Sequence, residues 1–263
     1  MINMNKYVKK KRKFNGIEYE YISISNEKKN NTIVLPGWQQ NVETYETMYK
    51  TISKYSNVYI IHFPGFINTV EPNRIVGLDY YVLLVKDLIE GLNLCNLLII
   101  GHSFGGRVAI KLQSIYKSAD YLLLVSSAGI KSKNILTKIK ILKYKVKKKI
   151  YKKINKVKLQ KLIEESGSKD FKQLSYVMKK TFIKIVNEDL TKHLKKIDVP
   201  VLLMWGSQDK TTPLWMAKKF SKKIKNSQLI VLKGCRHFSF LESKGQFNII
   251  LNAFYQNIWG DSY

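Results

Sequence analysis

The stretch LLIIGHSFGGRVAI, residues 97–110, decides the fold. Four apolar residues lead into a glycine-rich turn, and the turn is followed by apolar residues at helical spacing. A buried strand, a sharp turn and an amphipathic helix in direct succession are typical of a parallel sheet covered by helices. Ser103 lies at the turn between Gly101 and Gly105. The pattern therefore predicts a serine displayed at the carboxyl end of a strand.

Further strands and helices alternate on both sides of this stretch. Apolar, β-branched runs predict strands, and segments with a helical apolar period predict helices. The predicted strands cover residues 14–25 (a strand or hairpin), 31–38, 57–66, 96–102, 119–129, 199–209 and 227–237, and the predicted helices cover 78–92, 103–115, 213–224 and 247–258. This alternation indicates an α/β fold, with a mostly parallel central sheet flanked by helices.

One segment interrupts the alternation. Residues 131–163 contain 14 lysines and no Asp or Glu, and apolar residues recur there about every 3.5 positions. The period predicts one or two amphipathic helices with a lysine-coated face. A second helical pattern covers residues 170–186. We therefore expect a core of residues 1–131 plus 196–263 and a helical, lysine-rich lid of residues 132–195.

The charge of the chain follows from its lysine content. The net charge is +27, but only four of the 46 basic residues are arginine. Abundant Lys, Asn and Ile are what an AT-rich genome produces, and the lysine-rich segment lacks arginine and interleaved aromatic residues, so a nucleic-acid partner is not expected. For residues 131–163 we leave three interpretations open: a solvated face, docking on an anionic membrane, or steering of anionic substrates.

Apolar runs and cysteine content indicate where in the cell the protein is expected. No apolar run is long enough to cross a membrane, and no secretory signal pattern follows the basic N-terminal residues. Cys95 and Cys235 form neither a disulfide framework nor a metal-binding spacing. We therefore expect a cytoplasmic protein, a monomer or dimer, with peripheral membrane contact as the alternative.

A serine on such a turn is a candidate nucleophile. The motif G-x-S-x-G occupies residues 101–105, and its hydroxyl needs a base and an orienting acid. His237 follows the predicted strand at 227–233. Asp209, 28 residues before His237, lies at the end of the predicted strand that precedes it. All three residues thus end predicted strands, where open parallel sheets place their sites. We expect Ser103 to attack, His237 to carry the proton and Asp209 to orient the imidazole.

An acyl-transfer site also needs hydrogen-bond donors for a developing oxyanion. The N–H of Phe104 begins the helix after the serine, where negative charge is stabilised. The turn VLPGW supplies a second donor, for which we choose the N–H of Trp38. His102 occupies the variable position of the motif, where we expect packing. No metal and no organic cofactor is called for.

The segments GHSFGG (101–106), VLLMWGSQDKTTP (201–213) and LKGCRHFSFLE (232–242) resemble those of serine-type α/β-hydrolases, within them the small bacterial lidded hydrolases and esterases. The resemblance covers nearly the whole chain. It implies the α/β-hydrolase fold, the three roles given above and a helical lid between the sixth and seventh strands. One departure is the turn Pro36-Gly37, where these families commonly have His-Gly. Ser103 in place of a carboxylate argues against dehalogenase and epoxide-hydrolase chemistry.

These observations predict a serine hydrolase. We expect it to cleave a carboxylic ester, or a related acyl bond, of a hydrophobic small molecule through an acyl-enzyme. Hydrolysis of a C–C bond, a thioester or a lactone, and acyl transfer to another acceptor, stay open because the same triad serves all of them. A non-catalytic ligand-binding protein and a membrane-surface binder are the alternatives from other classes.

Overall fold

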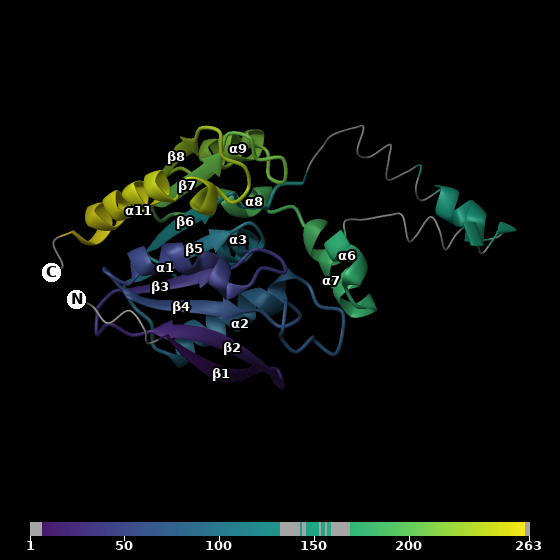
Figure 1. Ribbon diagram of the computed structural model, residues 1–263, viewed down its shortest axis with the longest axis horizontal. Coiled ribbons are helices and arrows are strands. Elements are labelled where there is room, and N and C mark those ends of the chain that lie inside the picture. The colour runs from purple at the N-terminus through teal and green to yellow at the C-terminus, as the bar shows by residue number, and fades with distance from the viewer. Residues whose placement is uncertain are drawn as a thin grey trace.

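In the computed structural model one sheet of eight strands organises the chain (Figure 1). The structure describes residues 7–131, 143, 146–152, 154–155, 157–158 and 169–260. The strands are β1 (Val8–Phe14), β2 (Ile17–Ile24), β3 (Asn31–Leu35), β4 (Asn57–His62), β5 (Leu97–His102), β6 (Tyr121–Val125), β7 (Val201–Gly206) and β8 (Ser227–Leu232). Their order is β1-β2-β4-β3-β5-β6-β7-β8. The β1–β2 and β2–β4 pairs are antiparallel and the others parallel, which confirms the mostly parallel sheet.

The central strands are buried along their whole length. Every residue of β3, β5 and β7 is buried. Along β5, Leu97 and Ile99 pack into the core on one face of the sheet, while Leu98 and Ile100 pack into the core on the other. Because successive side chains of a strand point to opposite faces, a strand covered on both sides must be apolar throughout. The apolar run of the opening stretch therefore marks a central strand.

The N-terminal hairpin begins earlier than the sequence pattern indicates. The pattern predicted a strand or hairpin over residues 14–25, whereas the hairpin covers Val8–Phe14 and Ile17–Ile24. Its turn is Asn15-Gly16, with φ of 50° and 78°, the positive values that a two-residue hairpin turn requires. Most of β1 is exposed and basic, since it is the edge strand, so no apolar pattern reveals it.

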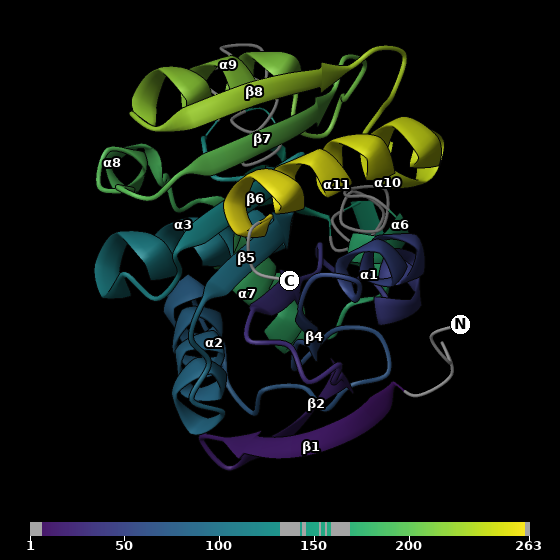
Figure 2. The same ribbon diagram turned by 90° about the vertical axis from the view of Figure 1, so that its left-hand side faces the viewer.

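Helices cover both faces of the sheet (Figure 2). One core contains residues of α2, α3, α8 and α9, and the other contains residues of α1, α10 and α11. Outside the segment between β6 and β7, the helices are α1 (Glu46–Ile52), α2 (Leu78–Gly91), α3 (Phe104–Tyr116), α9 (Leu214–Lys223), α10 (Ser239–Glu242) and α11 (Lys244–Trp259), with a 3-10 turn at Val42–Tyr45. This two-sided covering confirms the predicted layers, although the sequence pattern did not indicate α1 or α10.

The segment between β6 and β7 contains α6 (Lys169–Gln173), α7 (Tyr176–Val186) and α8 (Thr191–Leu194), and residues 146–152 are also helical. The short helix α8 packs against α3 and α9, and Leu194 is fully buried in the core. Most of the lysine-rich stretch 131–163 lies outside the described residues, which there are 131, 143, 146–152, 154–155 and 157–158. The division into a core and a lid of residues 132–195 therefore stays a prediction.

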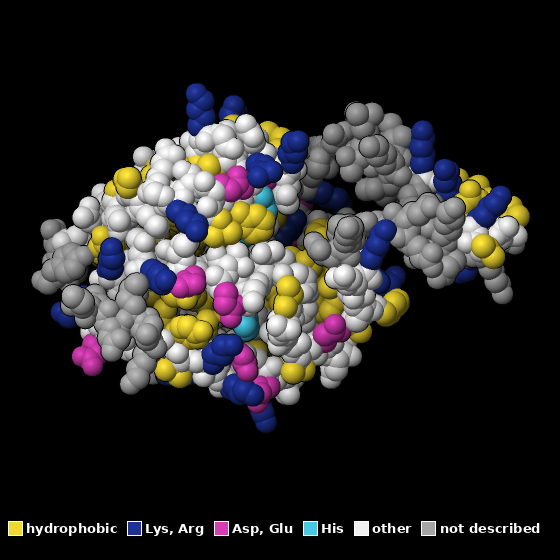
Figure 3. Space-filling model, viewed as in Figure 1, with side chains coloured by type: hydrophobic (Ala, Val, Ile, Leu, Met, Phe, Trp, Pro, Cys, Tyr) yellow, Lys and Arg dark blue, Asp and Glu magenta, His cyan; other side chains and the backbone are white. Residues whose placement is uncertain are grey.

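Among the helices that the structure describes, none combines the length and the hydropathy of a bilayer-spanning segment. Lysine and arginine side chains are spread over the face of the molecule that Figure 3 shows.

Candidate active site

Ser103 lies on a strained turn between β5 and α3. Its φ of 50° and ψ of −109° are values that only a constrained non-glycine residue adopts. The two glycines of the motif allow this approach of strand and helix. A Cβ on Gly105 would come within 1.9 Å of the Leu35 carbonyl oxygen, and a Cβ on Gly101 within 2.7 Å of the Gly106 backbone. A side chain at either glycine would therefore clash with the neighbouring backbone.

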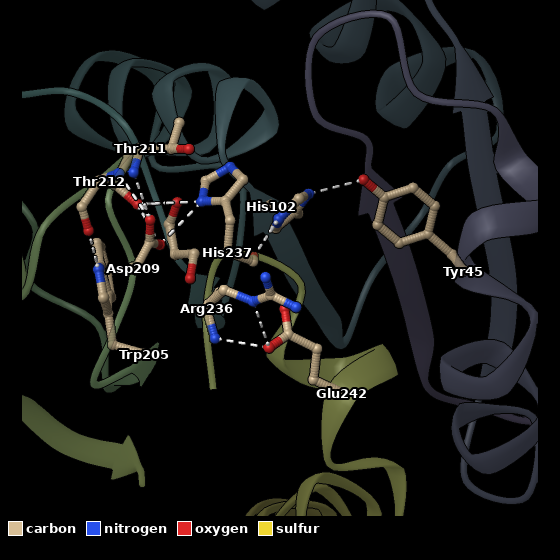
Figure 4. Close-up of polar contacts among 10 residues, drawn as sticks. Tyr45, His102, Trp205, Asp209, Thr211, Thr212, Arg236, His237 and Glu242 are labelled. Carbon is tan, nitrogen blue, oxygen red and sulfur yellow. Dashed lines mark hydrogen bonds and ion pairs between the residues drawn. The ribbon is translucent and has the colours of Figure 1, made fainter. Parts of the chain in front are cut away.

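Asp209 and His237 meet at the carboxyl ends of β7 and β8. The Asp209 Oδ2 and His237 Nδ1 atoms are 2.8 Å apart (Figure 4). The N–H groups of Thr211 and Thr212 donate to Asp209 Oδ1 over 2.8 and 2.9 Å, and the Thr212 hydroxyl donates to Oδ2 over 2.7 Å. These contacts fix the carboxylate so that it holds the imidazole through Nδ1 and leaves Nε2 for another partner.

The surroundings of Asp209 favour its charged form. Burial of the side chain raises the pKa of the carboxyl, but the hydrogen bond and charge of His237 and the hydrogen bonds from Thr212 outweigh burial. The net result is a pKa of Asp209 below its usual value. Asp209 is therefore a carboxylate at neutral pH, as an orienting acid must be.

Ser103 and His237 line one cavity of about 370 Å³. No hydrogen bond joins the Ser103 hydroxyl to the His237 imidazole, both of which the structure describes. Catalytic hydrogen bonds are often long in free enzymes and tighten when substrate binds. The structure thus joins Asp209 and His237 directly, and brings His237 and Ser103 to the same cavity without a direct hydrogen bond.

Trp38 and Phe104 line the same cavity beside Ser103. Their rings are in edge contact, with centroids 5.5 Å apart. Trp38 follows β3, and Phe104 is the first residue of α3, so the two backbones approach from neighbouring elements. The Gly37 N–H donates to the Tyr45 hydroxyl over 2.8 Å, which fixes the turn that carries Trp38. Both predicted oxyanion donors therefore belong to segments that border Ser103.

His102 has a role that the sequence did not indicate. Its Nδ1 lies 2.9 Å from the Tyr45 hydroxyl, and its Nε2 lies 3.1 Å from the His237 carbonyl oxygen (Figure 4). Because Tyr45 accepts from Gly37, its own proton is free to go to His102 Nδ1. The proton of His102 is then on Nε2 and is donated to the His237 carbonyl. His102 thus connects the Gly37 turn to the backbone of His237.

Burial keeps this bridging histidine neutral. Burial, followed by the proximity of His237, lowers the pKa of His102 to about 3. A neutral ring with one donor and one acceptor matches its two partners. Sequence reasoning missed this function because both partners, Tyr45 and His237, are distant along the chain.

The rest of the cavity wall is mostly apolar. Ile130, Phe182, Ile185, Met216 and Phe238 line it. Two of these residues, Phe182 and Ile185, belong to α7, so this helix contributes to the cavity wall. Among the described residues, no three His, Cys, Asp or Glu side chains gather in a way that could hold a metal ion.

The sheet order and the strained serine turn after β5 define an α/β hydrolase, and the protein is an enzyme of that class. Within this class the chain belongs to the family described as serine aminopeptidase, S33, whose model matches residues 78–244. The matched region contains Ser103, Asp209, His237 and α7.

Two curated relatives align over most of the chain. The AB hydrolase superfamily protein YisY of Bacillus subtilis is 28% identical over 244 residues, which are 84% of this chain and 90% of the relative. Monoacylglycerol lipase ABHD6 of Mus musculus is 26% identical over 246 residues, which are 80% of this chain and 70% of the relative. Among solved structures, an esterase from Exiguobacterium antarcticum superposes with a TM-score of 0.74 at 19% identity, covering 96% of this chain and all (100%) of that chain. At that identity the structural likeness supports the fold alone.

Proposed function

We propose that the protein is a serine hydrolase that cleaves carboxylic esters of hydrophobic small molecules through an acyl-enzyme. The observation that carries the proposal is the Asp209–His237 hydrogen bond at a cavity that also contains the strained Ser103. The choice of an ester is supported by the relatives, since one is named a monoacylglycerol lipase. The choice of a hydrophobic substrate is supported by the apolar wall of the cavity.

In the first half of the reaction the Ser103 oxygen bonds to the acyl carbon of the ester. His237 takes the serine proton on Nε2, while Asp209 holds Nδ1–H and stabilises the imidazolium. The ester carbonyl oxygen becomes an oxyanion, for which the N–H groups of Trp38 and Phe104 are the donors. The intermediate then breaks its bond to the alcohol oxygen, which leaves with the proton from His237.

In the second half a water molecule attacks the acyl carbon of the ester formed with Ser103. His237 takes one proton of this water, and the new intermediate expels the serine oxygen. The proton returns from His237 to Ser103, and the acid product leaves. Atoms and charges balance over the cycle without a further reactant.

The test is hydrolysis of p-nitrophenyl esters of graded chain length. We expect wild-type protein to release p-nitrophenol with a preference for a chain that fills the cavity. Ser103→Ala is expected to lose roughly 10³-fold or more in kcat. Ser53→Ala is the matched control, because Ser53 ends α1 and does not line the cavity. Undiminished hydrolysis by Ser103→Ala would overturn the proposal.

Peripheral contact with an anionic membrane is a separate proposal for the lysine-rich segment. In its described part, Val146, Ile150 and Ile154 recur every four residues and are all exposed, with lysines between them. We expect salt-sensitive co-sedimentation with vesicles containing phosphatidylglycerol, reduced by replacing Lys147 and Lys149 with glutamine. Equal binding to neutral phosphatidylcholine vesicles would contradict the proposal.

A further inference from the structure

Arg107 is a charged residue in a cavity wall that is otherwise mostly apolar. Only 5% of its surface is exposed, yet it lines the cavity that contains Ser103. Of the cavity residues that the structure describes, it is the one lysine, arginine, aspartate or glutamate. It lies on α3, about one helical turn beyond Ser103. A buried cation beside the reacting serine needs an explanation.

The known partners of Arg107 occupy one of its three nitrogens. Nη1 donates to the carbonyl oxygens of Ile185 and Glu188, over 3.2 and 2.9 Å, at the end of α7. Within the described chain no carboxylate forms an ion pair with Arg107, although two are nearby. The Glu188 carboxylate pairs with Lys111, and the Asp189 carboxylate accepts backbone N–H groups. Arg107 therefore anchors α7 and has no counter-ion among the residues that the structure describes.

The other two nitrogens, Nε and Nη2, belong to a residue that lines the cavity. No hydrogen bond from either atom reaches another described residue, because both bonds that Arg107 donates start from Nη1. Some described polar side-chain atoms are fully enclosed and have no hydrogen-bond partner, but Nε and Nη2 of Arg107 are not among them. Each atom therefore keeps some exposed surface, on a residue that is 5% exposed and lines the cavity. The donors on Nε and Nη2 are thus available to a molecule bound there.

The electrostatics agree with an unpaired cation. Burial lowers the pKa of Arg107 to about 10, and the charges of Glu188 and Asp189 offset only part of that effect. Arginines that are almost fully buried are ordinarily paired, because an uncompensated buried charge is costly. An anion in the cavity would supply the missing partner. Nε and Nη2 present parallel donors that match the two oxygens of a carboxylate.

We propose that Arg107 binds a carboxylate of the substrate, so that the preferred substrates are half-esters of dicarboxylic acids. The free carboxylate bonds Nε and Nη2 of Arg107 while the ester group reaches Ser103. This inference rests on the proposed ester hydrolysis and specifies its substrate class. The Cα atoms of residues 103 and 107 are about 6 Å apart along the helix axis, which favours a spacer of a few methylene groups.

The first measurement needs no variant. Methyl esters of monocarboxylic acids are compared with monomethyl esters of succinic, adipic and suberic acids of the same chain length, at pH 7, where the free carboxyl is ionised. We expect kcat/KM to favour the half-ester roughly 10- to 100-fold at the best chain length, the range that a charged hydrogen-bonded pair provides.

The second measurement assigns the preference to Arg107. Arg107→Gln keeps a donor for the α7 carbonyls but removes the charge, and Arg107→Lys keeps the charge but removes the paired donors. The readout is the ratio of kcat/KM for half-ester and neutral ester, because loosening of α7 affects both substrates. We expect the ratio to fall to about 1 in Arg107→Gln and to an intermediate value in Arg107→Lys.

Lys111→Gln is the matched control. Lys111 lies one turn further along α3 and binds Glu188 and Asp79, but it does not line the cavity. We expect this variant to keep the wild-type ratio. A wild-type ratio near 1 at every chain length, or an unchanged ratio in Arg107→Gln, would overturn the inference while Ser103-dependent hydrolysis of neutral esters still stood. Loss of that Ser103 dependence would instead overturn the proposed function.

Discussion

At the scale of single residues, the site depends on how each polar side chain is held. Asp209 is fixed by Thr211, Thr212 and His237, and His237 is fixed at Nδ1 and at its backbone carbonyl. The second of these contacts comes from His102, the residue before Ser103. A change at His102 therefore affects the base without touching the substrate's reacting atoms. We treat His102 as a positioning residue.

His102→Asn is expected to lower kcat roughly 10-fold with little change in KM, since it breaks a buried network that orients His237. Tyr45→Phe removes the partner of His102 and of the Gly37 N–H, and is expected to have a similar effect. If the two residues act through one network, the double variant is no slower than the slower single variant. Steady-state kinetics on one ester test this, and additive losses would contradict it.

His102 also predicts a change of stability with pH. Its pKa in the folded protein is about 3, below the ordinary 6.5, so unfolding takes up a proton between these values. The free energy of unfolding is therefore not reduced by His102 above pH 6.5. As the pH falls from 6.5 towards 3, it decreases by up to about 1.4 kcal/mol per pH unit. Urea unfolding between pH 7 and 4 should show a smaller fall in stability for His102→Asn than for wild type.

That comparison isolates one histidine from the others. Burial lowers the pKa of His62 and His193 as well, and these contribute equally to wild type and variant. The lowered pKa of Asp209 affects stability only as the pH falls below its ordinary 3.8, outside the measured range. Parallel curves for wild type and His102→Asn would contradict the assignment.

At the scale of elements, the strand–turn–helix of β5 and α3 depends on close backbone approach. Gly105→Ala places a Cβ against the Leu35 carbonyl at the end of β3. The two nearest atoms are the Leu35 carbonyl oxygen and carbon, which belong to the backbone and cannot move by a side-chain rotation. We expect a loss of about 1–3 kcal/mol in the free energy of unfolding, measured by urea denaturation. We also expect reduced kcat, because α3 and the turn after β3 carry Phe104 and Trp38.

Gly245→Ala is the control for that substitution. Gly245 lies in α11, and apart from its chain neighbours and the backbone of its own helix no atom lies within 4 Å of the position of its missing Cβ. Alanine is a better helix former than glycine, so stability should stay unchanged or rise by about 0.5–1 kcal/mol. Equal destabilisation by both substitutions would show that the close approach at Gly105 is unimportant.

Elements with strong local patterns could be predicted from the sequence, and the others could not. The strands β3, β5 and β7 are continuous apolar runs that are buried throughout, and the buried residues of α2 recur with the helical period. The edge strand β1 is basic and exposed, and the four-residue helices α8 and α10 are too short to show a period. An exposed strand or a very short helix has no apolar repeat, so the sequence pattern does not predict it.

At the scale of the whole molecule, the candidate site forms where neighbouring strands end. The sequence places Ser103, Asp209 and His237 after separate strands, and parallel pairing brings their ends to one edge. The functions proposed for His102 and Arg107 were not predictable in the same way. Each depends on partners far along the chain, Tyr45 for one and Ile185 for the other. Those contacts exist only once the strands and α7 are placed.

We propose that Ser103 is the nucleophile and that His237 and Asp209 activate it. The most direct measurement is labelling with a fluorophosphonate, followed by mass spectrometry of the labelled peptide. We predict one adduct on Ser103 in wild type, none in Ser103→Ala, and labelling slowed at least roughly 100-fold in His237→Ala. An adduct on another residue, or equal labelling of wild type and Ser103→Ala, would contradict the account.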